Sequence, residues 1–405
     1  MIRYLNLILC LLVLSGCDKD DIRALRVDLN FSGDLDSCVV DVVGLYSMSD
    51  WSGAVSCGEK DETMGNFVYS LYCKKEGRDT LIYREGFSSL YYEWATMEYE
   101  GKDRGMVFEH TLLVPYVDED LRLVIECRKG KEDSVVYDGM LDMRNVRKKK
   151  YDEVEMRYLH KAQESKSRTL DVAILAEGYM SEDSDLFWSD AKMLAEGLMS
   201  ESAYMKYSDK IHVRGFFKAS ATSGASDPSV GYKADNVLGS SFGVFGSDRY
   251  LETFETFAVY DYVGEYSADV FIVLVNSEKY GGGGVYNCFA IGSVESEDWV
   301  EVMMHELGHS FAGLADEYYY EGETSPDMYS MDVEPWEPNI TTLVDFDKKW
   351  KRLYDSKEVE LIEGAAYNAK GLYRSESNCK MRELHIPFCR VCNEAIENRI
   401  KRYIE

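Results

Sequence analysis

The sequence is short of positive charge, of histidine and of long apolar runs. Its 405 residues include 45 Lys and Arg against 73 Asp and Glu, so the formal net charge is -28. A surface this negative repels phosphate backbones and anionic headgroups, so we expect no nucleic-acid partner. After the N-terminus, no segment approaches the roughly 18 apolar residues of a membrane-spanning helix. Apolar residues still make up 45% of the chain, which indicates a globular protein long enough for two domains.

The first residues have the pattern of an export signal. Arg3 precedes an apolar run from Leu5 to Leu14, which is too short to span a bilayer and predicts a signal peptide over residues 1–16. The following Ser15-Gly16-Cys17 completes a segment that resembles a bacterial lipobox, in which Cys17 is lipidated, and residues 17–21 would form the lipid-anchor tether. We therefore expect an exported protein, an outer-membrane or cell-surface lipoprotein attached to the membrane by lipid at Cys17. An ordinary secretory signal with a chance cysteine is the alternative.

Two structural patterns follow the N-terminus. Residues 22–145 contain short alternating stretches, such as Arg23 to Phe31, separated by turn-rich segments, and they predict an antiparallel β-sandwich. The basic and polar stretch 146–168 is typical of a linker. In residues 169–405, apolar strands such as Leu170 to Leu175 alternate with expected helices, which predicts an α/β domain.

Eight cysteines remain if Cys10 leaves with the signal peptide and Cys17 is lipidated. In an oxidising compartment an even number of cysteines favours disulfides, although the sequence cannot define their pairing. Cys379 together with Cys389-Arg390-Val391-Cys392 is also compatible with a small metal knuckle. Because this segment lacks the second pair of a zinc ribbon, we rank a disulfide above the knuckle.

Two of the six histidines stand in the HExxH motif His305-Glu306-Leu307-Gly308-His309. On a helix, residues i and i+4 lie on one face, so both imidazoles can bind the same metal ion. Glu306, beside them, is placed to act as general base on a zinc-bound water. The motif therefore predicts one catalytic Zn²⁺. Two core or surface histidines on an amphipathic helix are the alternative.

A tetrahedral zinc ion needs a third protein ligand as well as water. Along a straight helix Asp316 would lie roughly 16 Å from His305, so the chain must turn back before Asp316 can bind the same ion. Gly313 is suited to end the helix. We expect Asp316 to be the third ligand, with Glu317 as the alternative. A glutamate farther along, such as Glu334, would be the ligand in a gluzincin.

The segment from His305 to Tyr318 closely resembles the signature of the M64 peptidase family, named after a bacterial immunoglobulin A peptidase. It is similar to the metzincin motif, with the glycine and the returning acid one place later. Glu177-Gly178-Tyr179 and Pro338-Asn339-Ile340-Thr341 extend the resemblance over the catalytic half, and the segment from Phe87 to Trp94 resembles the family's N-terminal β-domain. The resemblance implies a multidomain fold, an all-β sandwich followed by a metzincin-like zinc peptidase domain. It also implies that Met381 is the methionine of a turn beneath the zinc.

A run of four glycines, Gly281 to Gly284, precedes the expected zinc helix. Such a run is typical of a flexible connector. In metzincins an edge strand that pairs with extended substrate lies just before the zinc helix. The resemblance therefore makes Val285, Tyr286 and Asn287 candidates for a substrate-binding strand.

These patterns predict a lipid-anchored zinc endopeptidase that hydrolyses extracellular protein or glycoprotein substrates. Tyr318 or a neighbouring tyrosine is a candidate for stabilising the oxyanion. The alternative function is a surface-anchored glycan- or protein-binding lipoprotein on an inactive peptidase scaffold, against which the intact Glu306 argues. Immunoglobulin cleavage belongs to a family member, and nothing in this sequence defines the substrate.

Overall fold

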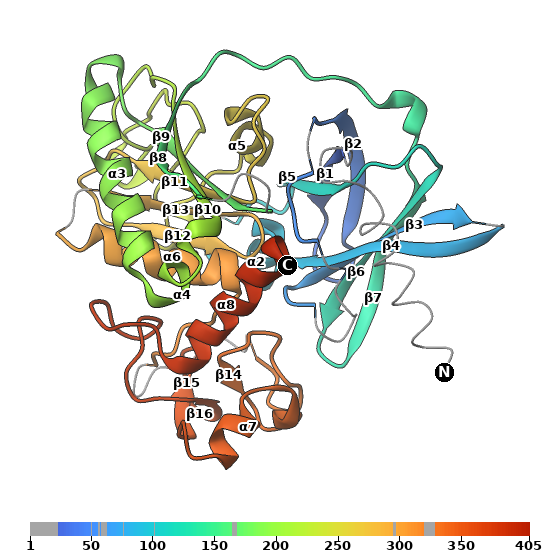
Figure 1. The fold of residues 1–405 in the computed structure, drawn as a ribbon, viewed down its shortest axis with the longest axis vertical. Helices are drawn as coiled ribbons and strands as arrows, with labels where there is room; N and C mark the ends of the chain where they lie inside the picture. Colours follow the sequence, from blue (N-terminus) through green and yellow to red (C-terminus); the bar gives the residue numbers. More distant parts are fainter. Residues whose placement is uncertain are drawn as a thin grey trace.

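The structure, a computed structural model, describes residues 23–405 except 50, 56, 58–62, 76, 101, 164–167, 295–296 and 320–328. The expected signal peptide, the tether and Cys17 lie outside the described residues. Three regions follow one another along the chain, namely a β-domain, an α/β domain and a C-terminal region with a small sheet and a long final helix (Figure 1). Within the described ranges, no helix has the length and apolar character needed to cross a membrane.

The N-terminal domain is a β-sandwich-like pair of antiparallel sheets, as the sequence predicted. Alternate residues such as Val27, Leu29 and Ile125 are fully buried between the sheets, which is the pattern of strands with one face in a core. A short helix, α2 (Leu90–Thr96), begins at Ser89, whose hydroxyl accepts the backbone N–H of Tyr91. The first sheet has the order β2-β1-β5 and the second β4-β3-β6-β7; the strands are β1 (Ala24–Ser32), β2 (Val39–Ser47), β3 (Phe67–Lys75), β4 (Arg78–Phe87), β5 (Phe108–Pro115), β6 (Leu121–Lys129) and β7 (Glu132–Met140).

The second domain contains a six-stranded mixed sheet in the order β12-β13-β11-β9-β10-β8. The four inner strands are parallel, and both edge strands run antiparallel to their neighbours. Their bounds are β8 (Glu155–His160), β9 (Leu170–Glu177), β10 (Ile211–Phe217), β11 (Val270–Val275), β12 (Gly282–Val285) and β13 (Phe289–Ser293). The stretch 146–168 is therefore not wholly a linker, because β8 lies within it. As a largely exposed edge strand, β8 has a polar composition that concealed it in the sequence.

Different layers cover the two faces of this sheet. In β9, Val172 and Ile174 pack with the helices of one face, whereas Ala173 and Leu175 belong to a core that is continuous with the N-terminal sandwich. The helices on the first face are α3 (Ser184–Ser200), α4 (Ser202–Met205), α6 (Trp299–Ala312) and α8 (Arg390–Ile404), and α5 (Thr256–Tyr262) lies on the second. The N-terminal domain therefore packs directly on the six-stranded sheet.

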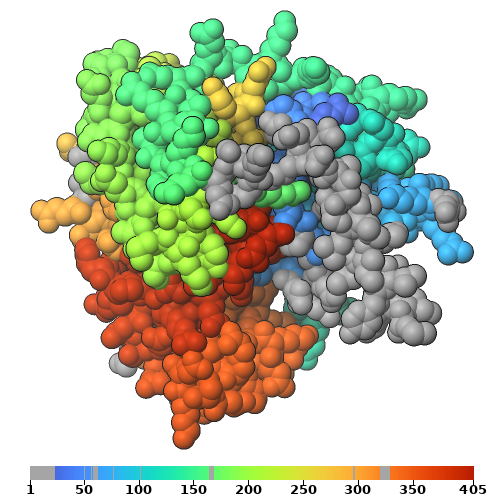
Figure 2. Space-filling view, viewed as in Figure 1, coloured from blue at the N-terminus to red at the C-terminus, as the bar shows by residue number. Residues whose placement is uncertain are grey.

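The C-terminal region carries a small sheet of order β14-β16-β15 and the helix α7. Its elements are β14 (Ile340–Thr341), α7 (Lys351–Asp355), β15 (Ile362–Ala365) and β16 (Asn368–Arg374). Ala366 and Tyr367 connect β15 to β16 with φ angles of 47° and 63°. Positive φ at both central residues is the geometry of a type I′ hairpin turn. The last helix, α8, lies between the α/β domain and the N-terminal domain, as the red surface in Figure 2 shows.

Candidate active site

Helix α6 carries the HExxH motif and ends where the sequence predicted. Its apolar residues, including Met303 and Leu307, are buried against the sheet, so the polar residues of the motif face away from that core. Gly313 has a φ of 62°, a left-handed conformation that suits glycine at a helix end. The N–H of Leu314 donates to Gly308 O at 3.1 Å, and the chain turns back towards the helix.

This reversal places Asp316 against both histidines. Asp316 Oδ1 lies 3.0 Å from His305 Nε2 and 3.4 Å from His309 Nε2. The two Nε2 atoms are 3.1 Å apart. Each Nδ1 faces a carbonyl oxygen, that of Lys380 at 3.0 Å for His305 and that of Leu314 at 2.5 Å for His309. Because a carbonyl accepts only from a protonated Nδ1, the neutral form of each imidazole presents the lone pair of its Nε2 to Asp316.

The two imidazole Nε2 atoms and Asp316 Oδ1 thus converge on one point, and their surroundings favour a bound cation there. Apart from the imidazoles, Asp316 Oδ1 has no hydrogen-bond partner among the described residues. Burial disfavours a charged imidazolium, yet the Asp316 carboxylate raises the pKa of His309 to about 9. The pKa of Asp316 is lowered, since His309 and His305 outweigh its burial. Two imidazoles and a carboxylate in this arrangement fit a metal ion of the zinc type.

The other acids considered from the sequence lie elsewhere. Glu317 is fully buried on the other side of the chain, and its carboxylate accepts from Asn339 Nδ2 at 3.0 Å and faces Cys392 Sγ at 3.3 Å. Glu334 accepts the N–H of Asp345 at 3.0 Å. Of the three candidates, Asp316 is the acid that the fold brings to the histidines.

Met381 lies directly beneath the motif. A Cβ on Gly308, between the two histidines, would stand 2.7 Å from the Met381 sulfur, so a larger residue here would displace the Met381 side chain. Met381 is fully buried, and its carbonyl oxygen accepts the N–H of Glu317 at 2.8 Å. The preceding carbonyl, of Lys380, is the one that faces His305. The turn around Met381 therefore orients one histidine and holds the segment of the returning acid.

Glu306 lies one residue from His305 and faces the edge strand β12. A Cβ added to Gly282 would lie 3.3 Å from Glu306 Oε1. Burial raises the pKa of Glu306 above its ordinary value, with a further contribution from Asp316, while the two histidines oppose the change. A carboxyl whose pKa is moved towards neutrality can both accept and return a proton.

The glycine run is a packed strand and not a flexible connector. Gly282 to Gly284 belong to β12, and a Cβ on Gly284 would stand 2.3 Å from the backbone oxygen of Glu306. The glycines thus let the edge strand lie directly against α6. Of the substrate-strand candidates, Val285 ends β12 with its side chain buried, and Tyr286 and Asn287 form the turn after it.

The turn at Tyr286 and Asn287 is instead held by the N-terminal domain and by α8. The N–H of Ser88 donates to Tyr286 O at 2.9 Å, and Asn287 Nδ2 donates to Gly86 O at 3.0 Å. Arg399 donates to Asn287 Oδ1 at 2.9 Å. The N-terminal domain therefore positions the end of the edge strand.

Tyr367 is a site residue that the sequence did not reveal. Its hydroxyl donates to Asp316 Oδ2, and its oxygen lies 3.1 Å from the hydroxyl oxygen of Tyr318. The left-handed turn that it shares with Ala366 carries it there, while the N–H of Ala366 bonds to Asp316 O at 2.9 Å. Neither the spacing of Tyr367 from the motif nor the sequence of its hairpin indicated a role in the site. Only the folded C-terminal region brings Tyr367 and Asp316 together.

The N-terminal domain also contributes an acid near the site. Glu93, on α2, accepts a short hydrogen bond from the Tyr250 hydroxyl. Burial raises the pKa of Glu93 to about 7. Glu252 lies on the same side of β12, since a Cβ on Gly283 would collide with its carboxylate. No sequence pattern pointed to these residues, which lie on segments far from the motif.

A cleft of about 2250 Å³ opens over these groups, and all three regions line it. The N-terminal domain contributes Tyr92 and Glu93. The α/β domain contributes the β12 glycines with the HExxH motif, and the C-terminal region contributes Trp336 and Tyr367. A cleft of this size over a helical HExxH motif and a glycine edge strand is the arrangement expected of a peptidase.

Comparison with known protein families identifies the family of this chain. Residues 157–359 and 354–400 match the family described as IgA Peptidase M64, and residues 19–137 match the one described as Peptidase M64 N-terminus. The chain therefore belongs to the M64 peptidase family, in both its catalytic and its N-terminal parts. A comparison with curated protein sequences found no match.

Proposed function

We propose that this M64 peptidase is a zinc-dependent endopeptidase of extracellular proteins. The observation that carries the proposal is the convergence of His305, His309 and Asp316 on one point, with Glu306 beside it and an open cleft above. When bound there, a zinc ion supplies a Lewis acid that polarises a peptide carbonyl and activates water.

The chain's own residues perform the proton transfers and the positioning. Glu306 takes a proton from the attacking water and returns it to the leaving amine. Tyr367 holds Asp316 through its hydroxyl, and the carbonyl oxygens of Lys380 and Leu314 hold the two imidazoles. The edge of β12 would bind an extended substrate through backbone hydrogen bonds, so we expect polypeptide substrates with modest side-chain selectivity.

Proteolysis by wild-type protein and by Glu306→Gln tests the catalytic proposal. Both proteins are incubated with denatured casein and a panel of secreted glycoproteins, and new peptide termini are identified by mass spectrometry. We expect the variant to be slower by about 10²–10⁴-fold, because it lacks the general base. Glu383→Gln is the matched control, since Glu383 is exposed and lines the same cleft.

Two results would contradict the catalytic proposal. Equal cleavage by wild type and Glu306→Gln would exclude Glu306 as the base. An absence of new termini from folded, zinc-loaded wild type would favour the binding lipoprotein on an inactive scaffold.

We also propose that the protein is exported and held at the membrane by lipid on Cys17, as the lipobox-like Leu14-Ser15-Gly16-Cys17 supports. Cell fractionation of wild type and Cys17→Ala tests this anchor. We expect wild type in the membrane fraction and the variant outside it. Equal membrane association of both proteins would refute the anchor without affecting the catalytic proposal.

A further inference from the structure

A second group of metal-binding side chains lies apart from the candidate active site. Three cysteines and one glutamate, all buried, bring one ligand atom each to within 4.8 Å of all the others. Cys379 Sγ and Cys392 Sγ are 3.6 Å apart. Glu317 Oε1 lies 3.3 Å from Cys392 Sγ and 4.0 Å from Cys389 Sγ. We propose that Glu317, Cys379, Cys389 and Cys392 bind a second, structural zinc ion.

The distances fit a tetrahedral ion. A Zn–S bond of about 2.3 Å separates two sulfur ligands by about 3.8 Å at the tetrahedral angle, close to the 3.6 Å between Cys379 and Cys392. Three sulfurs and one carboxylate oxygen complete four-fold coordination with no open position. A closed, sulfur-rich tetrahedral set is typical of structural zinc.

The surroundings of the cysteines suit thiolate ligands. Cys389 and Cys392 are the cap and the first turn of α8, where helix N–H groups favour negative charge. The N–H of Cys389 donates to Cys379 Sγ at 3.3 Å, and that of Cys392 to Cys389 Sγ at 3.5 Å. The Ser375 hydroxyl oxygen also lies 3.5 Å from Cys389 Sγ. These contacts resemble the outer shell that orients metal ligands.

Glu317 supplies an independent indication of a bound cation. Its side chain is fully buried, and Oε2 has no hydrogen-bond partner among the residues that the structure describes. Its Oε1 is held by Asn339 Nδ2, and Asn339 is fixed in turn by the backbone N–H and carbonyl of Ala315, each at 2.8 Å. A carboxylate buried among sulfurs is costly unless a positive charge compensates it.

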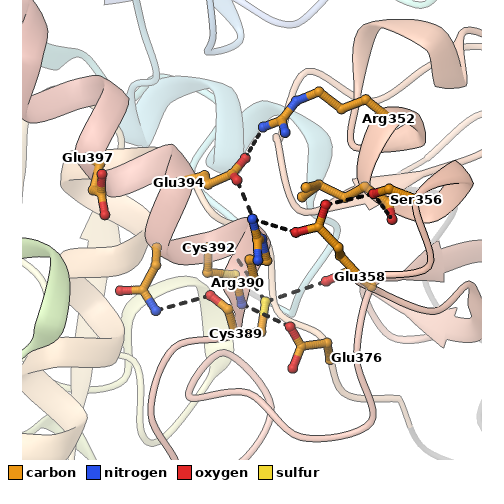
Figure 3. A network of polar contacts seen from close by, with 12 residues as sticks. Arg352, Ser356, Glu358, Glu376, Cys389, Arg390, Cys392, Glu394 and Glu397 are labelled. Carbon is orange, nitrogen blue, oxygen red and sulfur yellow. Dashed lines mark hydrogen bonds and ion pairs between the residues drawn. The ribbon is translucent and has the colours of Figure 1, made fainter.

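Neighbouring ion pairs hold the start of α8 in place. Figure 3 shows Arg390 between Glu358 and Glu394, beside Cys389 and Cys392. Arg390 lies 2.7 Å from Glu358, and its N–H donates to Glu376 at 2.9 Å. These links connect α8 to the segments before and after the β15–β16 hairpin. The four-residue site therefore has a preorganised frame.

This second ion would join the segments that build the candidate active site. Glu317 follows Asp316 directly, and Cys379 stands two residues before Met381. Cys379 also adjoins Lys380, whose carbonyl faces His305. We therefore expect the second ion to fix the returning acid and the methionine turn together. Its loss would weaken zinc binding at the histidines by about 10–100-fold, as outer-shell changes do.

The test measures zinc per chain and the atoms bound to it in the purified full chain. Wild type should hold about two zinc ions. A His305→Ala/His309→Ala variant should keep one, and X-ray absorption should show about three sulfur neighbours near 2.3 Å and one oxygen. Cys389→Ser/Cys392→Ser should lose the sulfur-bound ion. The matched control is Cys73→Ser/Cys127→Ser, which alters two buried cysteines outside the group and should keep both ions.

Each contrary outcome is distinct. A folded His305→Ala/His309→Ala variant that holds no zinc overturns the second site, and this arm does not depend on the cysteine variants folding. A wild-type chain lighter by two hydrogens, with a Cys379–Cys392 disulfide, overturns it as well. One ion bound by nitrogen and oxygen alone would refute this inference and leave the proposed function intact. One sulfur-bound ion alone would support this site and contradict the zinc peptidase.

Discussion

The buried ion pair between the N-terminal domain and α8 leads to a prediction about stability. Glu85, 2% exposed, lies 3.2 Å from Arg399 Nη1 and 2.8 Å from Arg402 Nη2. Replacing Glu85 with Ala leaves Arg399, also 2% exposed, without its buried counter-ion. Removing one member of such a buried pair costs about 3–5 kcal/mol of unfolding free energy. We expect Glu85→Ala to be destabilised by that amount.

Urea denaturation followed by tryptophan fluorescence measures the effect. Glu85→Gln keeps hydrogen-bonding atoms while removing the charge, so its loss should be smaller. Asp138→Ala removes a partner of Arg122 in an exposed ion pair and should scarcely change stability. A loss below about 1 kcal/mol for Glu85→Ala would refute the reasoning, because the unpaired Arg399 would then be compensated elsewhere.

The same pair links stability to catalysis. Beside Glu85, the Gly86 carbonyl and the Ser88 N–H hold the turn of Tyr286 and Asn287 at the end of β12. Loosening the domain contact should therefore displace the edge strand and lower peptide cleavage. A Glu85→Ala protein that is destabilised but fully active under folding conditions would separate the two effects and remove the proposed link.

Three further outcomes follow from the site and the interface. Gly284→Ala should abolish most cleavage, because the new Cβ would stand 2.3 Å from Glu306 O and force β12 away from α6, as assayed by casein hydrolysis. Tyr367→Phe should weaken zinc binding by about 10–100-fold, as measured by chelator competition, since Asp316 loses a hydrogen bond. Burial opposes ionisation of Glu85, but Arg399 and Arg402 hold its pKa below the ordinary 4.5. The stabilisation from Glu85 should therefore be complete above that value and decline as the pH falls below it, as measured by urea midpoints against pH.

Each of these outcomes has a control. Gly105→Ala adds a methyl group near only an exposed Asp103 side chain and should leave hydrolysis unchanged. Tyr354→Phe alters an exposed tyrosine on α7 and should leave zinc affinity unchanged. For Glu85→Gln, the acid decline should be smaller than in wild type. Full activity of Gly284→Ala would contradict the close packing of β12 on α6. An unchanged zinc affinity in Tyr367→Phe would contradict the role of its hydrogen bond to Asp316. Identical pH profiles of wild type and Glu85→Gln would contradict the contribution of the Glu85 ion pairs.

Local patterns in the sequence predicted the strands and helix ends that depend mainly on nearby residues. The alternating stretch from Arg23 to Phe31 predicted β1, and the apolar run from Leu170 to Leu175 predicted β9, because each pattern is typical of a strand packed on a core. The end of α6 was evident because Gly313 tolerates the left-handed conformation. Strand β8 was missed, since an exposed edge strand carries no apolar period.

Contacts between distant segments decided the rest of the candidate site. Asp316 and Glu317 are neighbours with similar chemistry, so no local property separates them, and only the fold turns one to the histidines and the other to the cysteines. The glycines of β12 are recognisable as a packed strand only when α6 lies against them. The role of Tyr367 depends likewise on the C-terminal hairpin lying against Asp316.

By itself the sequence determined the candidate metal ligands and the candidate base, because the spacing in His305-Glu306-Leu307-Gly308-His309 places three side chains within little more than one helical turn. It also determined the family, because the motif and the other similar segments are each a continuous stretch of sequence. The tertiary structure decided which acid joins the histidines, what holds β12, and that three cysteines gather around Glu317. The physical reason is that these arrangements arise from packing between segments far apart in the chain, where long-range geometry outweighs local preference.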